Sequence, residues 1–140
     1  MSWISLRFAP ARSSIFYSYS RRSLRNSDRM PNVLCLLTSQ SSVVVDGHSS
    51  VPHCGASSSC LRAFMEELSR HSIAISYATT HGQECSVFVE EADSEWYFSN
   101  STAYDDPKSL SDCSAADFDG LLIPSSYGGL TDLVSSRFVA

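Results

Sequence analysis

The sequence predicts an α/β protein that holds part of a doubly wound parallel sheet. Two short apolar runs, residues 33–38 and 121–123, have the continuous hydrophobicity of strands that are buried on both faces. Between them, residues 60–71 carry apolar side chains at helical spacing, and residues 73–78 give a further strand. Strand, helix and strand in this order predict a βαβ unit with a right-handed crossover.

The first strand, residues 33–38, lies between Pro31 and a serine-rich segment and is expected at the centre of the sheet. Residues 39–59 contain eight serines together with three glycine or proline breakers, so they are predicted to form a long loop. Within this loop, the three valines at 43–45 are a candidate for a short edge strand.

The predicted helix over residues 60–71 is amphipathic. Its apolar side chains follow the i, i+3, i+4, i+7 pattern of one helix face and are Leu61, Phe64, Met65 and Leu68. The charged side chains fall on the outer face and are Arg62, Glu66, Glu67 and Arg70. Ser58 or Ser59 is expected to cap the first turn, because serine hydroxyls accept hydrogen bonds from free amides there.

The second half of the chain continues with shorter elements. Residues 86–89 and 96–98 are strand candidates around an acidic turn, and residues 107–117 form a polar connector with at most one helical turn. After the strand at 121–123, Gly128 and Gly129 are expected to free the backbone for a tight turn. A helix should follow, with apolar side chains Leu130, Leu133, Val134 and Phe138.

Charge is divided unevenly along the 140 residues. Residues 1–30 hold six arginines against one acid, a net charge of +5, whereas residues 31–140 hold four basic groups against fourteen acids, a net charge of −10. The acidic body excludes nucleic acid as a direct ligand, since phosphate binding needs clustered Lys and Arg. No apolar stretch reaches the ~20 residues of a membrane span, so we expect no membrane insertion.

The basic N-terminus is predicted to be separate from the folded domain. Residues 1–31 are rich in arginine and serine and lack sustained periodicity, which is typical of a disordered extension. The same composition is also that of a mitochondrial transit peptide, so a mitochondrial location is the alternative to a cytoplasmic one. Residues 32–140 would then form the domain.

The five cysteines are an odd number in a chain without a secretory signal, and are interpreted as reduced intracellular thiols. Four possible zinc ligands fall within thirteen residues, namely His48, His53, Cys54 and Cys60. Adjacent His53 and Cys54 cannot easily bind the same ion, so a flexible loop is the better interpretation. We expect no metal site and no cofactor.

Cysteine chemistry has one candidate in this sequence. Cys60 lies near a predicted helix start, which favours a thiolate, and His53 or His81 could come near it. Cys35 falls in a strand and Cys113 in a connector, where both are expected to be inert. We expect no catalytic residue among the five thiols; redox sensing through Cys60 or Cys54 is a further hypothesis.

Residues 117–128 resemble a motif of the class I glutamine-amidotransferase-like superfamily, which includes the ThiJ/PfpI proteins. The pattern D-x-D-x-L-x-I-P-x-x-x-G corresponds to Asp117, Asp119, Leu121, Ile123, Pro124 and Gly128. The looser resemblance extends over about residues 32–136. It implies a flavodoxin-like sheet, of which this chain would hold the N-terminal half, because the family's nucleophilic cysteine lies on an elbow after the next strand, beyond the last residue, Ala140.

The resemblance also implies where catalytic groups would lie. In active relatives an acid just after the first strand supports the nucleophile, and here the loop offers only Asp46, while Glu66 and Glu67 fall on the outer helix face. The turn at Gly128 and Gly129 would lend backbone amides to an oxyanion hole. Without the nucleophile and the acid, we expect a non-catalytic protein.

The function that the resemblance implies is that of an interaction subunit. The branch of the family closest to residues 117–133 implies protein partners in a multi-subunit Rab-effector complex on early endosomes, which links endosomes to mRNA and ribosomes. Self-association into a homo-oligomer is also compatible with the sequence. The alternative is a ThiJ/PfpI-type enzyme, a cysteine hydrolase or a glyoxalase-like protein, whose catalytic half is missing from this sequence.

Overall fold

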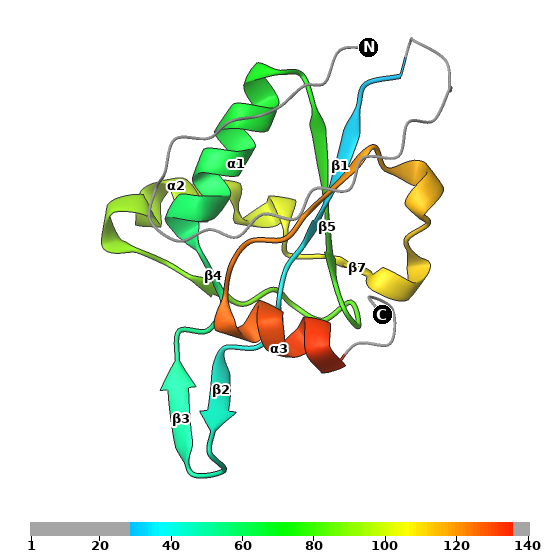
Figure 1. Cartoon of the computed structure of the whole chain (residues 1–140). Coiled ribbons are helices and arrows are strands. Elements are labelled where there is room, and N and C mark those ends of the chain that lie inside the picture. The colour runs from blue at the N-terminus through cyan, green and yellow to red at the C-terminus, as the bar shows by residue number, and fades with distance from the viewer. Residues whose placement is uncertain (1–28, 136–140) are drawn as a thin grey trace.

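The computed structural model describes residues 29–135. The predicted basic extension, apart from its last three residues, and Phe138 therefore lie outside the described residues. Four parallel strands form the main sheet of the described part, in the order β7-β5-β1-β8 (Figure 1). Their bounds are β1 Asn32–Leu36, β5 Ala74–Thr79, β7 Lys108–Ser109 and β8 Gly120–Leu122. The sheet and its flanking helices confirm the predicted α/β fold class.

Strand β1 lies at the centre of the sheet, as predicted, with β5 on one side and β8 on the other. Its side chains alternate between two hydrophobic cores. Cys35 and Leu37 pack in a core with Leu61 on one face, whereas Leu34 and Leu36 pack in a second core on the other. Burial on both faces explains why the sequence of this strand is continuously apolar.

Helix α1 (Ser58–Arg70) covers the first core together with α2 (Figure 1). Leu61 and Phe64 are 1% and 7% exposed, which confirms the predicted apolar face. The cap lies one residue earlier than expected, because the side chain of Ser57 accepts the hydrogen bond from the backbone N–H of Cys60. The unit β1-α1-β5 is the βαβ unit that the sequence predicts.

The strand predicted over residues 96–98 is wrong, because these residues lie in helix α2 (Ser94–Asn100). Two short 3-10 turns flank it, η1 (Glu91–Asp93) and η2 (Ser101–Ala103). Trp96 and Tyr97 pack against the first core and so gain burial without a strand. Aromatic residues favour strands only when they fit a pleated surface, and here packing against the core decides instead.

The opposite face of the sheet carries the polar connector. Residues 107–117 contain β7 and two 3-10 turns, η3 (Leu110–Asp112) and η4 (Ala115–Asp117). Leu110 and Phe118 pack on the second core, next to Leu34 and Leu36. The connector is thus more ordered than predicted, and β7 adds an outer strand that the sequence did not reveal.

The predicted long loop at 39–59 is instead a β-hairpin followed by a short strand. β2 (Ser42–Val45) pairs antiparallel with β3 (Ser49–Pro52), and the hairpin projects from the body (Figure 1). Asp46 and Gly47 have φ of 56° and 73°, the left-handed conformations that reverse a hairpin. The valines at 43–45 therefore form a hairpin strand, not an edge of the main sheet.

A second small sheet follows the hairpin. β4 (Ala56–Ser57) pairs in parallel with β6 (Val87–Phe88), which confirms a strand within the predicted residues 86–89. Gly55 precedes β4, and a Cβ there would lie 2.3 Å from the backbone oxygen of Ser86. This close approach requires glycine and fixes the chain entering α1.

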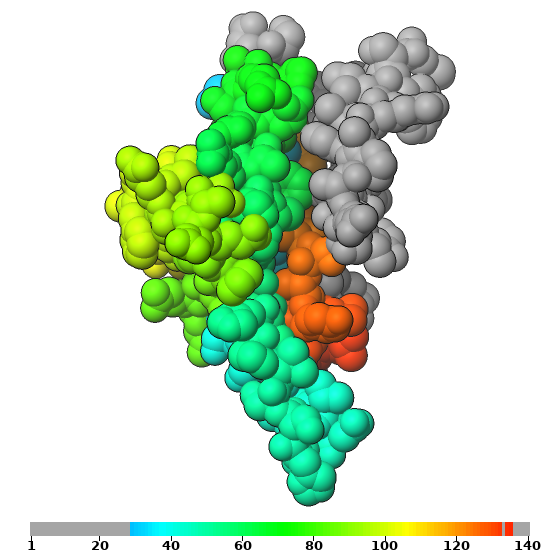
Figure 2. All heavy atoms as spheres, turned by 90° about the vertical axis from the view of Figure 1, so that its left-hand side faces the viewer, coloured from blue at the N-terminus to red at the C-terminus, as the bar shows by residue number. Residues whose placement is uncertain are grey.

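Helix α3 (Tyr127–Ser135) follows β8 after a short link and lies beside the hairpin (Figure 2). The predicted glycine turn is wrong, because Gly128 and Gly129 lie inside the first turn of α3 and neither has a positive φ. β8 is half-buried and lies at the edge of the described sheet opposite β7. Among residues 29–135, no helix has the length and hydrophobicity of a membrane span.

Candidate functional site

In open α/β sheets, ligands bind beyond the carboxyl ends of the strands, where neighbouring connections leave in opposite directions. In this structure that position lies between β1 and β8, since β1 continues to β5 on its other side. The groups at this edge are the residues after β1, the residues after β8 and the first turns of α3. This edge of the sheet is therefore the candidate functional site.

A buried acid lies at this edge, although it comes from a different segment than expected. The hydroxyl of Thr38 donates a hydrogen bond of 2.6 Å to Asp132 Oδ2, and the two residues are 2% and 8% exposed. The backbone N–H of Gln40 donates to Thr38 Oγ1 at 3.0 Å. Asp46, the acid that the sequence offered, is exposed at the tip of the hairpin.

Sequence reasoning missed Asp132. Its only signal is a lone acid within the apolar stretch 130–134, which is typical of a buried carboxylate with a specific partner. In the sequence prediction, Thr38 is only the last residue of the first strand. The pair joins the segment after β1 to α3, and its two residues are 94 positions apart in the chain, so no local sequence pattern specifies it.

The backbone amides at the start of α3 already have protein acceptors. Gly128 N–H donates to the backbone oxygen of Cys54 at 2.9 Å, and Gly129 N–H donates to Ser126 Oγ at 3.0 Å. A Cβ at Gly128 would lie 2.9 Å from the Cys54 oxygen and from Gln40, so the glycine permits this close contact. These two amides stabilise the helix start and are not directed at an open oxyanion site.

The thiols of Cys35, Cys60, Cys85 and Cys113 lie in environments that favour the neutral form. Burial raises the pKa of Cys60 to about 11 and, together with the nearby acids Glu84 and Asp105, raises the pKa of Cys85 to about 12. Burial also raises the pKa of Cys35 and Cys113 above the ordinary value. The helix start near Cys60 therefore does not produce the low-pKa thiolate that nucleophilic catalysis requires.

The four possible zinc ligands are not brought together. His53 packs against Phe88 in a tilted arrangement with ring centroids 4.7 Å apart, and the Cys54 thiol donates to the backbone oxygen of Val51 at 3.0 Å. His48 lies in the hairpin turn, and Cys60 lies in the first turn of α1. Within residues 29–135 there is no group of three or more His, Cys, Asp or Glu side chains that could hold an ion.

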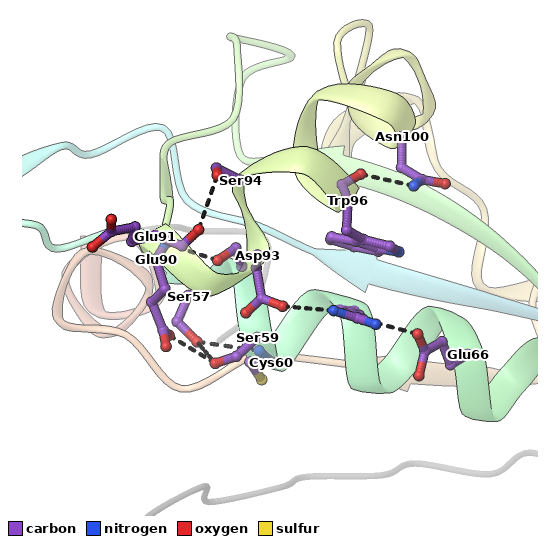
Figure 3. Close-up of polar contacts among 12 residues, drawn as sticks. Ser57, Ser59, Cys60, Glu66, Glu90, Glu91, Asp93, Ser94, Trp96 and Asn100 are labelled. Carbon is purple, nitrogen blue, oxygen red and sulfur yellow. Dashed lines mark hydrogen bonds and ion pairs between the residues drawn. The ribbon is translucent and has the colours of Figure 1, made fainter.

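A polar network fastens η1 and α2 to α1 (Figure 3). Arg62 pairs with Glu66 at 2.9 Å and with Asp93 at 3.0 Å. The hydroxyl of Ser59 donates to Glu90 Oε1 at 2.7 Å, and Ser58 Oγ accepts from the backbone N–H of Glu90. A shallow groove of about 340 Å³ opens beside this network, lined by Arg62, Ala92, Glu95, Trp96, Ser99 and Asn100.

The role of this polar network is structural, because it holds η1 and α2 against α1. Both carboxylate partners of Arg62 come from the same chain, so its guanidinium is already neutralised. Figure 3 shows Asn100 reaching back to the carbonyl of Trp96, a bond of 2.8 Å that closes α2. The groove is open and polar, unlike the enclosed apolar pockets in which small molecules bind.

Six of the large apolar side chains that are exposed in residues 29–135 come from the hairpin and from α3. We define the hairpin–α3 surface by six side chains that are 36–82% exposed, namely Val44, Val45, Val51, Tyr127, Leu130 and Val134. β2 and α3 are neighbours in space, which Figure 2 shows where the hairpin meets the helix. Exposed patches of this kind mark interaction sites on soluble proteins.

The chain matches no protein-family model and no curated protein sequence. The resemblance of residues 117–128 to the class I glutamine-amidotransferase-like superfamily therefore stays a prediction from the sequence.

Proposed function

We propose that this protein is a non-catalytic member of the class I glutamine-amidotransferase-like superfamily that acts as an interaction subunit, in an early-endosomal Rab-effector complex that links endosomes to mRNA and ribosomes. The observation that carries the proposal is the hairpin–α3 surface. At the edge where this fold ordinarily binds its ligand, the described residues present exposed valine, leucine and tyrosine side chains.

The interior of the same edge supports a non-catalytic role. Thr38 and Asp132 satisfy each other, and the amides of Gly128 and Gly129 are held by acceptors from the chain itself. A catalytic site needs hydrogen-bond donors that are free to stabilise the charge that develops on the substrate. Here the same groups fasten α3 to the loops that follow β1.

The exposed side chains support association with other proteins. Contiguous apolar patches on a protein surface mark sites that a partner covers, and interface cores are enriched in aromatic and apolar side chains. The endosomal location and the Rab-effector complex come from the family resemblance of residues 117–133. The strongly acidic body fits a partner that is protein and not nucleic acid.

The test compares a tagged full-length chain with variants of the hairpin–α3 surface in cells. The surface variant combines Val44→Thr, Leu130→Gln and Val134→Gln, which keep the β-branched shape in the strand and good helix formers in α3. Phe98→Gln is the matched control, because Phe98 is 73% exposed in α2. The wild type and the control should co-purify with a Rab-binding complex and sediment with early endosomes, whereas the surface variant should do neither.

The enzyme hypothesis predicts a different result. The purified wild type would then turn over an amide, a peptide or a glyoxal, and Cys60→Ala would abolish that rate. Such a rate would refute the non-catalytic role. Uniform distribution of the tagged wild type through the cytosol, or its import into mitochondria, would refute the endosomal part of the proposal.

A further inference from the structure

We propose that the acidic connector of this protein is the docking surface for the arginine-rich N-terminal segment of the same chain, residues 1–28. The acidic connector is residues 105–119, and its acids are Asp105, Asp106, Asp112, Asp117 and Asp119. The proposal is independent of the hairpin–α3 surface. It rests on an arginine that already lies on the connector, on the charge of the two segments and on the reach of the chain.

Arg29, the residue that directly follows the N-terminal segment, lies on the acidic connector. Its guanidinium donates to the backbone oxygen of Asp117 at 3.2 Å and pairs with Asp119 Oδ2 at 3.1 Å. Asp119 is held in place for this contact, because its Oδ2 also accepts from the backbone N–H of Asn32 at 2.9 Å. The N-terminal segment therefore joins the body at a point where the connector already binds a guanidinium.

The connector carries more negative charge than Arg29 neutralises. Residues 105–119 contain five acids and one lysine, a net charge of −4, and all five acids are exposed. Apart from Asp119, none of these acids forms an ion pair with a basic side chain of residues 29–135. Residues 1–28 contain five arginines and one acid, a net charge of +4. The connector and the segment are therefore complementary in charge.

A second acid-rich region, residues 90–95 in η1 and α2, is a poorer match for the arginines. Asp93 already pairs with Arg62 at 3.0 Å, and Glu90 accepts a hydrogen bond from Ser59 at 2.7 Å. This region packs with α1 on the face of the sheet opposite to the connector (Figure 1). The point at which the N-terminal segment joins the body therefore favours the connector.

The arginines nearest to the body are close enough in the chain to reach the connector. An extended chain advances ~3.5 Å per residue, so Arg25 can lie up to ~14 Å from Arg29, and Arg21 up to ~28 Å. By the same limit, Asp112 lies no more than ~18 Å from Asp117, which Arg29 contacts. Arg25 can therefore meet Asp117, and Arg21 can extend as far as Asp112.

Several weak contacts within one chain are sufficient for this docking. A single exposed ion pair is weak, and salt screens it. The arginines act together, however, because Arg29 holds the segment near the connector and so gives it a high effective concentration there. Ion pairs need no regular secondary structure, so an arginine- and serine-rich composition is adequate. While the segment is docked, its arginines are not available to an anionic membrane surface.

The experiment measures the rate of trypsin cleavage after Arg21, Arg22 and Arg25 in the full 140-residue chain, by mass spectrometry. A synthetic peptide of residues 15–31 is the reference for a segment that has no connector. At low salt, the full chain should be cleaved about tenfold more slowly than the peptide, because several ion pairs act together. The difference should disappear in about 1 M salt, which screens charges beyond ~3 Å.

Matched variants locate the docking surface. Asp112→Asn combined with Asp117→Asn removes two exposed acids of the connector and should abolish most of the protection from trypsin. Glu91→Gln combined with Glu95→Gln removes the same charge from the α2 side and should leave the protection unchanged. Circular dichroism should be the same for both double variants and the wild type, since all four side chains are exposed.

Chemical cross-linking provides a second measurement. Arg25→Lys supplies an amine, which a carbodiimide couples to a carboxylate only when the two groups are in contact. The expected product is a link from position 25 to an acid of the connector within one chain. Cleavage of wild type as fast as the peptide at low salt, or protection that survives the Asp112 and Asp117 changes, would overturn the proposal. Links to the acids of α2, or links between two chains, would overturn it as well.

Discussion

Helices α1 and α3 both carry apolar residues at helical spacing, yet α1 buries two of these side chains and α3 exposes two. In α1, Leu61 and Phe64 are 1% and 7% exposed, whereas in α3, Leu130 and Val134 are 61% and 82% exposed. α1 lies along the sheet and covers a core. α3 lies at the end of the sheet beside the hairpin, and its first turn is fixed by the bond from Gly128 to Cys54.

This difference between α1 and α3 shows that helical periodicity in the sequence predicts an apolar face but does not predict what covers that face. For α1 the cover is the sheet of the same chain. For α3 the described part of the chain supplies a firm attachment at one end and little cover along the apolar face. An anchored helix with an uncovered face is what a protein-binding surface requires, because the backbone is fixed before the partner arrives.

The largest expected effect tests this contrast directly by truncating one leucine in each helix. Leu61→Ala should lower the free energy of unfolding by ~2–5 kcal/mol, because it removes a buried side chain and leaves a cavity. Leu130→Ala should change the free energy of unfolding by no more than about 0.5 kcal/mol. Urea denaturation followed by circular dichroism, at a concentration low enough to keep the chain monomeric, measures both values.

The two variants are matched in chemistry and differ only in burial, so each serves as the control for the other. Equal losses would show that α3 is covered in the folded monomer, and the contrast between the helices would fail. A small loss at Leu61 would show that α1 is not the main cover of the first core.

A smaller effect is expected at the attachment of α3 to β1. Thr38→Val keeps the shape of the side chain but removes the donor to Asp132, and it should lower the free energy of unfolding by ~1–3 kcal/mol. Asp132→Asn should cost a similar amount. In the double variant the two losses should not add, because both single changes act on the same 2.6 Å bond: Thr38→Val removes its donor, and Asp132→Asn replaces its charged acceptor with a neutral one.

Additive losses in this double-mutant cycle would show that Thr38 and Asp132 act independently. Thr131→Val is a suitable control, since Thr131 is exposed in α3 and its hydroxyl only bonds the carbonyl of Tyr127 one turn earlier. It should leave the free energy of unfolding nearly unchanged. The cycle thus measures how firmly α3 is attached, separately from how little of its apolar face is covered.

The βαβ core could be predicted from the sequence because its signals are local and mutually consistent. The apolar run of β1 and the helical spacing of α1 each predict one element, and together they predict the parallel pairing with β5. The strand prediction for residues 96–98 was wrong because an aromatic triplet fits a short strand or a short helix equally well. Packing of Trp96 on the first core decided between them.

The candidate site was harder to predict, because its contacts join distant segments. The bond between Thr38 and Asp132 spans 94 positions, and no local pattern specifies it. The Asp-Gly pair at 46 and 47 was a usable hairpin signal that the serine-rich composition obscured. Exposure along α3 could not be inferred at all, since the helical pattern of Leu130 and Val134 equally describes a buried face.

The smallest expected effect on stability at neutral pH concerns Cys60, in the first turn of the covered helix. Burial raises the pKa of its thiol from 9.0 to about 11, whereas an exposed thiol at a helix start would have a lowered pKa. Because the folded state keeps the proton between these two values, this group lowers folding stability only as the pH rises above about 9 and has no effect at pH 7.

Alkylation kinetics make this prediction measurable. At pH 8 the thiolate fraction of Cys60 should be about 100-fold below that of a thiol with the ordinary pKa of 9.0, so its reaction with iodoacetamide should be slower by a similar factor. The rate, followed by peptide mass spectrometry, should keep rising toward pH 11. The urea-unfolded chain is the control and should titrate near 9. A rate that levels off near neutral pH would show a reactive thiolate, which would extend the exposed, functional region to α1 and restore the enzyme hypothesis.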